Sequence, residues 1–309
     1  MIVTVTVNAA IDKSYFVDRL EPGTVSRVPD IRAIPGGKGI NVARVAHLLG
    51  EPVIATGFLG GHNGRFIRTE LDRQGITNDF VAIEGESRVC LNIIERGSGR
   101  STELLEQGPA TGQEDWSRLR DKIRQLARGA SVVAFSGSLP QGAAPDAYAS
   151  LMEAARAEGA RVFLDTSGDA LAAGVAASPD FIKPNETEVE RLLGRPLGPE
   201  SELHASIRRL MEDGIGCVTV SLGAGGSLAG IGGELYRVTV PRITPVNTVG
   251  CGDSFVAGMA AAVRRGLSME DSLRLASACG TANALTRDAG TVDPAQVEEL
   301  LPQIRIDRL

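Results

Sequence analysis

One aspartate of this chain occupies a sequence context that suits proton transfer beside a phosphate. Residues 247–254 are Asn-Thr-Val-Gly-Cys-Gly-Asp-Ser and precede an apolar run with helical spacing, so Asp253 lies at a predicted helix start. The free amides and positive dipole end of a helix start suit phosphate, and Gly250 and Gly252 allow the backbone to approach it closely. Asp253 could therefore accept a hydroxyl proton next to a bound phosphate. The alternative is that Asp253 only caps the helix.

A second polar pair begins another predicted helix. Residues 182–188 are Ile-Lys-Pro-Asn-Glu-Thr-Glu, and Asn185 and Glu188 are three positions apart, so they share one helix face. An amide and a carboxylate there could hold the water shell of Mg²⁺, an ion that keeps several of its waters. The same pair could form a capping box with Asn185 at the N-cap. The two roles are compatible.

Two glycine-rich turns could present backbone amides to a ligand. Residues 35–41, Pro-Gly-Gly-Lys-Gly-Ile-Asn, open a helix whose amides could meet sugar hydroxyls, with Lys38 and Asn41 as polar contacts. Residues 221–227, Ser-Leu-Gly-Ala-Gly-Gly-Ser, follow a strand and could hold nucleotide phosphates or ribose. Either segment could instead be a plain tight turn. The chain has neither a Walker P-loop nor a Gly-x-Gly-x-x-Gly fingerprint, which excludes a dinucleotide-dependent dehydrogenase.

Composition and charge narrow the class of protein. The chain has 309 residues, 43% hydrophobic and 23% charged, which is enough apolar sequence for a large core. A net charge of -6 gives no general attraction for nucleic acid or an anionic membrane, and no apolar run could span a bilayer. Four scattered cysteines and three histidines favour reduced thiols over a zinc site. We therefore expect a cytoplasmic protein with neither nucleic acid nor membrane as a partner.

The elements that must position these motifs alternate between strand and helix. Strands are expected at residues 2–7, 53–59, 132–135, 161–164, 181–182 and 217–221, and helices at 39–49, 65–74, 145–158, 186–193, 202–212, 253–264, 269–285 and 294–301. Such alternation predicts an α/β fold in which helices cover both faces of a mainly parallel sheet. Ligands of such sheets bind at the carboxyl ends of the strands.

Two stretches depart from this alternation. Residues 13–34 contain strand-like pieces and no helix, and residues 88–105 contain two strand-like runs joined by Gly-Ser-Gly-Arg, which predicts a hairpin. We expect both to form one small β lid inserted into an α/β body. The predicted boundaries are residues 12–35 and 88–108 for the lid and residues 1–11, 36–87 and 109–309 for the body. Because an isolated small sheet is marginally stable, its exposed face is expected to pair with a second subunit in a homodimer.

The combined motifs resemble those of ribokinase-type sugar kinases, in the phosphofructokinase-B branch, over nearly the whole chain. The similarity covers residues 7–12 (Val-Asn-Ala-Ala-Ile-Asp), 36–41, 136–140 (Ser-Gly-Ser-Leu-Pro), 183–188 and 250–253. Within that branch the chain is most similar to tagatose-6-phosphate kinases and bacterial 1-phosphofructokinases, and residues 88–90 and 101–109 favour the first group. The resemblance implies a ribokinase-like three-layer sandwich with a mainly parallel central sheet and a β lid.

The resemblance also implies a role for each motif residue. Asp253 matches the catalytic base, and the anion hole matches Gly250, Cys251 and Gly252. The sugar and its phosphate match Asp12, Arg27, Gly36, Gly37, Lys38, Asn41, Arg88, Ser136 and Ser138. ATP matches Lys183, Asn185, Ser221, Gly223, Gly225 and Asn283, and Mg²⁺ matches Glu188 and Asn185, through water.

Two positions depart from the family pattern. Cys251 replaces an alanine or serine, which an anion hole made of backbone amides should tolerate. Asn247 replaces an aspartate that is tied to monovalent-cation binding in ribokinases, so cation activation is not predicted.

These roles imply a kinase that uses MgATP to convert a ketohexose monophosphate to a bisphosphate. Arg88 favours a phosphorylated sugar, because an arginine fork suits phosphate. A kinase of an unphosphorylated sugar or a nucleoside is the alternative within the enzyme class. A non-catalytic sugar-phosphate sensor would be expected to lack the base or the glycine pair, and both are present. The configuration of one hydroxyl distinguishes the ketohexose phosphates, and the motifs leave that choice open.

Overall fold

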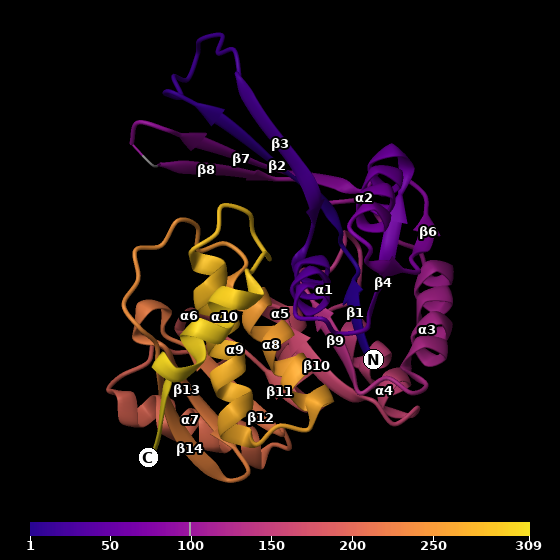
Figure 1. The fold of residues 1–309 in the computed structure, drawn as a ribbon. Helices are drawn as coiled ribbons and strands as arrows, with labels where there is room; N and C mark the ends of the chain where they lie inside the picture. Colours follow the sequence, from indigo (N-terminus) through magenta and orange to yellow (C-terminus); the bar gives the residue numbers. More distant parts are fainter. Residues whose placement is uncertain (99) are drawn as a thin grey trace.

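A computed structural model describes residues 1–98 and 100–309 and has a large sheet between two layers of helices (Figure 1). The strands of this sheet are β1 (Ile2–Thr6), β4 (Val53–Gly60), β5 (Thr77–Asn78), β6 (Val81–Ile83), β9 (Val132–Ser136), β10 (Arg161–Asp165), β11 (Phe181–Ile182), β12 (Cys217–Ser221), β13 (Ser227–Ile231), β14 (Glu234–Thr239) and β15 (Arg305–Arg308). They are ordered β15-β14-β13-β12-β11-β10-β9-β1-β4-β5, and β6 also pairs with β4. Strands β12 to β15 pair antiparallel and the remaining pairs are parallel, so the predicted mainly parallel sheet is confirmed.

Both faces of the sheet are covered by helices. One layer contains α1 (Lys38–Leu48), α2 (Gly61–Arg73), α8 (Cys251–Arg265), α9 (Met269–Ala284) and α10 (Pro294–Leu300), and the other contains α3 (Gln113–Ala127), α4 (Ala147–Arg156), α5 (Gly168–Val175), α6 (Glu186–Leu193) and α7 (Glu200–Glu212). Successive strand residues enter opposite cores, as Ile2 and Val3 do. Because both faces are buried, the inner strands are apolar throughout, which explains their continuous hydrophobic runs.

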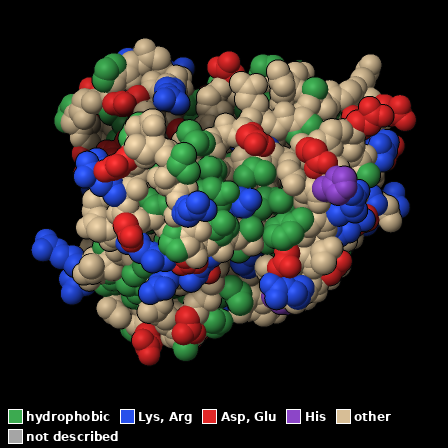
Figure 2. All heavy atoms as spheres, turned by 90° about the horizontal axis from the view of Figure 1, so that it is seen from above, with side chains coloured by type: hydrophobic (Ala, Val, Ile, Leu, Met, Phe, Trp, Pro, Cys, Tyr) green, Lys and Arg blue, Asp and Glu red, His purple; other side chains and the backbone are tan. Residues whose placement is uncertain are grey.

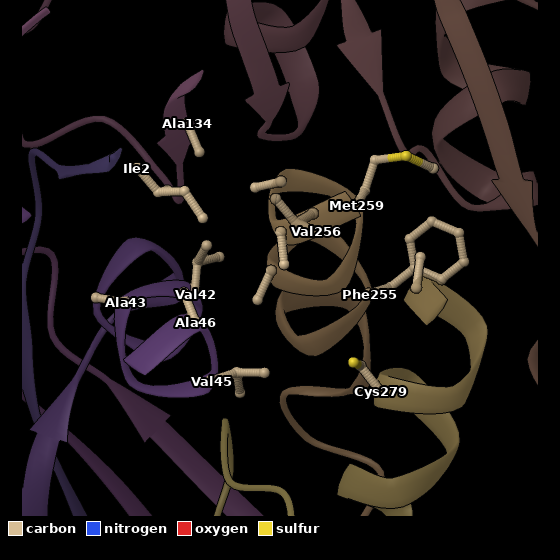
Figure 3. Close-up of a cluster of buried hydrophobic side chains, with 14 of the residues drawn as sticks. Ile2, Val42, Ala43, Val45, Ala46, Ala134, Phe255, Val256, Met259 and Cys279 are labelled. Carbon is tan, nitrogen blue, oxygen red and sulfur yellow. The ribbon is translucent and has the colours of Figure 1, made fainter. Parts of the chain in front are cut away.

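Helices α1 and α8 pack side by side on the sheet, and their side chains point toward one another in Figure 3. Val42 and Val45 of α1 and Val256 of α8 are fully buried, together with Ile2 and Ala134 of the strands beneath them. Burial of one such aliphatic side chain contributes about 1.5–3 kcal/mol. This cluster therefore holds the two helices in a fixed relation.

A separate four-stranded sheet, the lid, projects above the body in Figure 1. Its strands, in spatial order, are β3 (Asp30–Gly36), β2 (Ala10–Val17), β7 (Arg88–Glu95) and β8 (Ser101–Leu105). Strand β2 pairs with β7 in parallel, whereas the two outer pairs are antiparallel. The predicted hairpin is confirmed as β7 and β8, although Gly99 of its turn lies outside the described residues.

Some elements differ from the expectation drawn from sequence. Helix α2 begins at Gly61, four residues before the predicted start, so the glycine pair at residues 60–61 opens a helix as well as closing a strand. Helices α3 and α5 and strands β13 to β15 were not predicted. Helix α3 buries Leu119, Ile123, Leu126 and Ala127 at helical spacing, so its periodic signal was present in the sequence and was overlooked, whereas α5 is short, rich in alanine and weakly periodic.

Three further features concern membrane spans, cysteines and metal-ligand clusters in the described part of the chain. No helix in residues 1–98 and 100–309 is long and apolar enough to cross a membrane. Cys90, Cys217, Cys251 and Cys279 are free thiols. Over the same residues, no group of three or more His, Cys, Asp or Glu side chains is arranged to hold a metal ion directly.

Candidate active site

The predicted site residues gather at the carboxyl edge of the parallel sheet, below the lid. Strands β9, β10 and β12 end there at Ser136, Asp165 and Ser221. Helices α1 and α8 begin at the same edge and bring Asn41 and Asp253 within hydrogen-bond distance, although 212 positions separate them in the chain. This is the edge at which ligands of open α/β sheets bind.

Asp253 lies in the first turn of α8 and is 5% exposed. Its Oδ2 accepts a hydrogen bond of 2.8 Å from Asn41 Nδ2. The capping alternative is contradicted, because the N-cap of α8 is Gly250 and no side chain caps that helix. Burial raises the pKa of Asp253, against the opposing effects of Lys38, the Asn41 hydrogen bond and Lys183. The carboxylate is thus a stronger base than an exposed aspartate.

The start of α8 leaves its backbone open to a ligand. Gly250 has φ +85°, a left-handed conformation that side chains other than glycine rarely adopt. A Cβ atom at residue 252 would lie 2.9 Å from Lys183 Nζ, so the ammonium group lies against this backbone. The Cys251 N–H makes a long hydrogen bond of 3.4 Å to Thr248 O. A phosphoryl group at this place would meet this weakly bonded amide, the amides of Gly250 and Gly252, the positive helix end and the Lys183 charge.

An ion pair with a buried carboxylate and a half-exposed lysine lies beside Asp253. Lys38 Nζ is 3.2 Å from Asp165 Oδ2, and the Asp165 side chain is almost completely buried. Burial alone would raise the pKa of Asp165, but Lys38 and Lys183 hold it below its usual value. Asp165 in turn raises the pKa of Lys38. Asp165 was not predicted as a site residue, although its position directly after a predicted strand was a usable signal.

The root of the lid carries Asp12 and Arg88. Burial raises the pKa of Asp12 to about 6, although Arg44 and Arg88 oppose this. Arg88 is anchored by backbone carbonyls, since Nε donates to Asn8 O at 3.2 Å and Nη1 to Glu106 O at 3.1 Å. Its guanidinium is therefore pre-oriented at the edge of the site.

Asn8 ties this root to the body. Its Nδ2 lies 3.1 Å from Gln107 O and 3.3 Å from Ser138 Oγ, so it joins the end of the lid to the loop after β9. A hollow of about 550 Å³, lined by Arg88 and by residues 84–86 and 106–110, opens next to it. Asn8 belongs to the motif of residues 7–12 but was not predicted as a site residue.

The predicted nucleotide residues follow β11 and β12. Asn185 and Glu188 form the capping box, with each side chain accepting from the other's backbone amide at 2.9 Å. Asn185 also bridges to Ser221, which precedes the turn of residues 223–225. Glu188 accepts through Oε2, so Oε1 is available to a metal-bound water. The donor set therefore fits Mg²⁺ held through water and does not fit a closed protein cage.

Two predicted residues, Arg27 and Ser136, differ in how they are placed relative to the site. Arg27 is exposed in the loop between β2 and β3, at the far end of β2 from Asp12, and the single chain does not bring it to the site. Ser136 is buried, and its Oγ has no hydrogen-bond partner among the described residues.

Direct nucleotide contact by Asn283 is contradicted. Its side chain is fully buried, Oδ1 accepts from Ser254 Oγ at 3.1 Å and Thr291 N at 3.2 Å, and Nδ2 donates to Val249 O at 2.8 Å. Asn283 holds the loop before α8 from behind, because all its polar capacity is used there.

The chain is similar in sequence and structure to known carbohydrate kinases. Residues 3–296 match the pfkB family of carbohydrate kinases. A candidate phosphofructokinase from Staphylococcus aureus is 31% identical, with 100% of this chain and 99% of that chain covered and a TM-score of 0.86. Phosphofructokinase-2 from Escherichia coli in complex with fructose-6-phosphate is 26% identical over 97% of this chain and 98% of that chain, with a TM-score of 0.91. Arabidopsis thaliana ribokinase complexed with ribose and ATP is 25% identical over 97% and 98%, with a TM-score of 0.79.

Proposed function

Because the chain belongs to the pfkB family of carbohydrate kinases, we propose that it transfers the γ-phosphoryl group of ATP to a ketohexose monophosphate and forms a bisphosphate. The observation that carries this proposal is the buried Asp253 carboxylate, oriented by Asn41 at the open start of α8. The base and the anion-binding backbone lie on one helical turn. A non-catalytic sensor would have no need of both.

In the proposed mechanism Asp253 accepts the proton of the attacking sugar hydroxyl. The sugar oxygen forms a bond to the γ-phosphorus while the bond to the ADP oxygen breaks, and the proton stays on Asp253 until the product leaves. The amides at residues 250–252 and the Lys183 ammonium stabilise the charge that spreads over the transferred group. Lys38, fixed by Asp165, adds a second cation at the same edge.

Mg²⁺ would be held through water by Glu188 and Asn185, and it would neutralise charge on the nucleotide phosphates. Ser221 and the turn of residues 223–225 would contact the nucleotide on the same side. Lys183 is two positions before Asn185 and its Nζ lies against Gly252, so its charge would act on both the nucleotide phosphates and the transferred phosphoryl group.

Arg88 supports a substrate that already carries a phosphate. Its Nε and Nη1 are held by carbonyls, and Nη2 makes no hydrogen bond in the described parts of the chain, so the group can bind an anion without rearranging. A kinase of an unphosphorylated sugar is the second candidate, favoured by the likeness to a ribokinase complexed with ribose. Among phosphorylated substrates we propose tagatose-6-phosphate or fructose-1-phosphate. The cytoplasm, which supplies ATP and keeps thiols reduced, suits such an enzyme.

A substrate panel tests the proposal. ADP release is measured with tagatose-6-phosphate, fructose-1-phosphate, fructose-6-phosphate, fructose and ribose, each with MgATP. We expect kcat/KM for one ketohexose monophosphate to exceed that for either free sugar by at least about tenfold, since one charge-assisted contact contributes that much. A preference for fructose or ribose would replace this proposal by the second candidate.

The lid is proposed to form a homodimer. In Figure 2, which views the molecule from above, hydrophobic side chains gather across the middle of the face. Asp12, which belongs to the site, pairs with Cys90 on the neighbouring strand, so Cys90 lies on the same face of the lid. Because successive strand residues point to opposite faces, Leu91 lies on the face away from the site, where it pairs with Leu104. Ile31 and Leu104 are 52% and 56% exposed. An apolar sheet face of this kind needs a cover, and a second copy of the lid would supply one.

We expect Leu91→Asp to weaken dimerisation by at least about tenfold, because a carboxylate would be buried without a partner. It should also raise KM for the sugar, because Asp12 and Arg88 lie on β2 and β7, the strands that dimerisation would hold in position. Sedimentation velocity and steady-state kinetics measure the two effects.

The matched control is Leu267→Asp, an equally apolar-to-charged change at a residue 40% exposed beyond the C-terminal end of α8. It should alter neither quantity. A wild-type protein that is monomeric and fully active at micromolar concentration would refute the lid-paired dimer.

A further inference from the structure

Arg44 is a buried cation that no motif selected. It lies on α1, one turn after Asn41, and is 7% exposed. Nη1 donates to Asn41 Oδ1 at 2.9 Å and to Ala289 O at 3.2 Å, and Nε donates to Gln74 Oε1 at 3.2 Å. Burying a charge is costly unless it is paired and hydrogen-bonded, so a guanidinium here has a specific use.

The contacts of Arg44 determine which way the Asn41 amide faces. A guanidinium can only donate hydrogen bonds, so the atom of Asn41 that it meets must be the carbonyl oxygen. The other end of the amide is then the NH₂ group, and it donates to Asp253 Oδ2 at 2.8 Å. With the amide reversed, its NH₂ group would face the N–H of Arg44 and its oxygen would face the carboxylate of Asp253, and neither buried pair could form a hydrogen bond.

Arg44 also joins segments from different parts of the chain around the site. Besides Asn41 of α1, it contacts Pro35 O at the lid root and Ala289 O in the loop after α9. A Cβ atom at residue 290 of that loop would lie 2.5 Å from the Asn41 Cβ, so the loop packs directly on the amide. Rotation of Asn41 is thereby restricted by packing as well as by hydrogen bonding.

We propose that Arg44 is a positioning residue that locks the Asn41 amide as a donor to Asp253 Oδ2 and leaves Asp253 Oδ1 for the hydroxyl proton of the substrate. This inference rests on the proposed function for its catalytic meaning, but the Arg44–Asn41–Asp253 chain of hydrogen bonds exists without it. Both the hydrogen bond and the nearby positive charge favour the ionised form of Asp253.

Other charges face these two groups and must be counted. Asp253 is faced by Lys38 and Arg44 on α1, Asp165 on β10, Lys183 after β11 and Asp12 on β2, and Arg44 is faced by Asp12, Asp253 and Asp288. Burial lowers the pKa of Arg44, and the three carboxylates oppose that effect. Since Asp12 also titrates near neutral pH, the test uses kcat at saturating sugar, which does not report on sugar binding.

The test compares Arg44→Met with the wild type. Methionine keeps the apolar stem and removes both the charge and the donors. We expect the acid limb of the kcat–pH profile to move up by about 1 pH unit, because loss of an opposite charge and a hydrogen bond raises the pKa of a carboxylic acid. We also expect kcat at the plateau to fall by about 10- to 100-fold, the usual effect of a misoriented catalytic group.

Gln74→Met is the matched control, because it removes only the Nε contact of Arg44 and leaves Asn41 bonded. It should lower the melting temperature without moving the pH profile. Equal profiles for Arg44→Met and the wild type would overturn the positioning role. Should Arg44→Met not fold, Arg44→Lys takes its place: it keeps the charge but not the simultaneous contacts, so kcat should fall about tenfold with little change in the acid limb. Wild-type turnover in that variant would equally overturn it.

A readout without catalysis separates this inference from the proposed function. The carboxyl carbon of Asp253, assigned by its loss in Asp253→Asn, is titrated by nuclear magnetic resonance in the wild type and in Arg44→Met. An upward pKa shift of about one unit supports the hydrogen-bonded chain even if no sugar of the panel is phosphorylated. An active wild type with an unchanged Asp253 pKa in the variant contradicts it.

Discussion

Replacing Asp253 with asparagine is expected to lower kcat by about 10²–10⁴-fold, the usual contribution of a general base. Asparagine keeps the shape of the side chain, and α8 loses no cap, because its N-cap is Gly250 without a side-chain hydrogen bond. Removing a buried carboxylate whose pKa is raised by burial also avoids a desolvation cost. We therefore expect native folding and unchanged ATP affinity. Turnover, thermal melting and calorimetric ATP titration measure the three properties.

The control for this change is Asp271→Asn in the first turn of α9. Asp271 is exposed and bonds with Ser268 and Arg274, away from the site. Its replacement should leave kcat within about twofold, as surface changes usually do. Wild-type turnover in a folded Asp253→Asn variant would rule out Asp253 as the base and would move the proton acceptor to another group, such as Asp165.

Replacing Arg88 with alanine is expected to raise KM for the sugar phosphate by about 10- to 100-fold, because a charge-assisted hydrogen bond contributes about 1.5–3 kcal/mol. KM for ATP should stay within about twofold, since Arg88 lies at the lid root and the nucleotide residues lie beyond Lys183. The activity with a free ketohexose should not fall in proportion, because that substrate lacks the phosphate that Arg88 binds. Kinetics with both substrate types give this comparison.

Arg96→Ala provides the matched control on the lid. Arg96 is an exposed arginine at the end of β7, paired with Asp30 at 3.0 Å, and lies away from the lid root. Its loss should change neither KM. If Arg88→Ala raised only KM for ATP, Arg88 would belong to the nucleotide site and the phosphorylated substrate class would lose its main support.

Much of the fold and several site residues could be predicted locally. The strands at residues 181–182 and 217–221 and the helix at residues 186–193 match the structure, because their apolar periods and polar boundaries are contained in a few neighbouring residues. The capping box of Asn185 and Glu188 is also observed as expected. Such motifs are predictable because three or four consecutive residues form them.

Elements with a weak periodic signal were missed. Strands β13 and β14 meet at the glycine pair of residues 232–233. Strand β13 pairs with β12, which lies earlier in the chain, and β14 pairs with β13 and with β15 near the C-terminus. Their own residues include few strong strand formers in alternation. Tertiary pairing therefore decided their conformation, because strand propensity depends strongly on the neighbouring strands.

The sequence by itself determined which chemical groups stand at the predicted element boundaries. These are Asp253 with two glycines at one helix start, Lys38 and Lys183 near two others, and Arg88 at the root of the lid. Only the tertiary structure decided which of these groups meet. Asn41 and Asp253 are 212 positions apart, and Lys38 and Asp165 are 127 apart, so no local pattern encodes their contact. The pKa of Asp253 depends on burial and on these distant charges, which exist only once α1, α8 and the sheet have packed together. For the same reason Arg44 could not be recognised in advance, since its role consists entirely of contacts that packing creates.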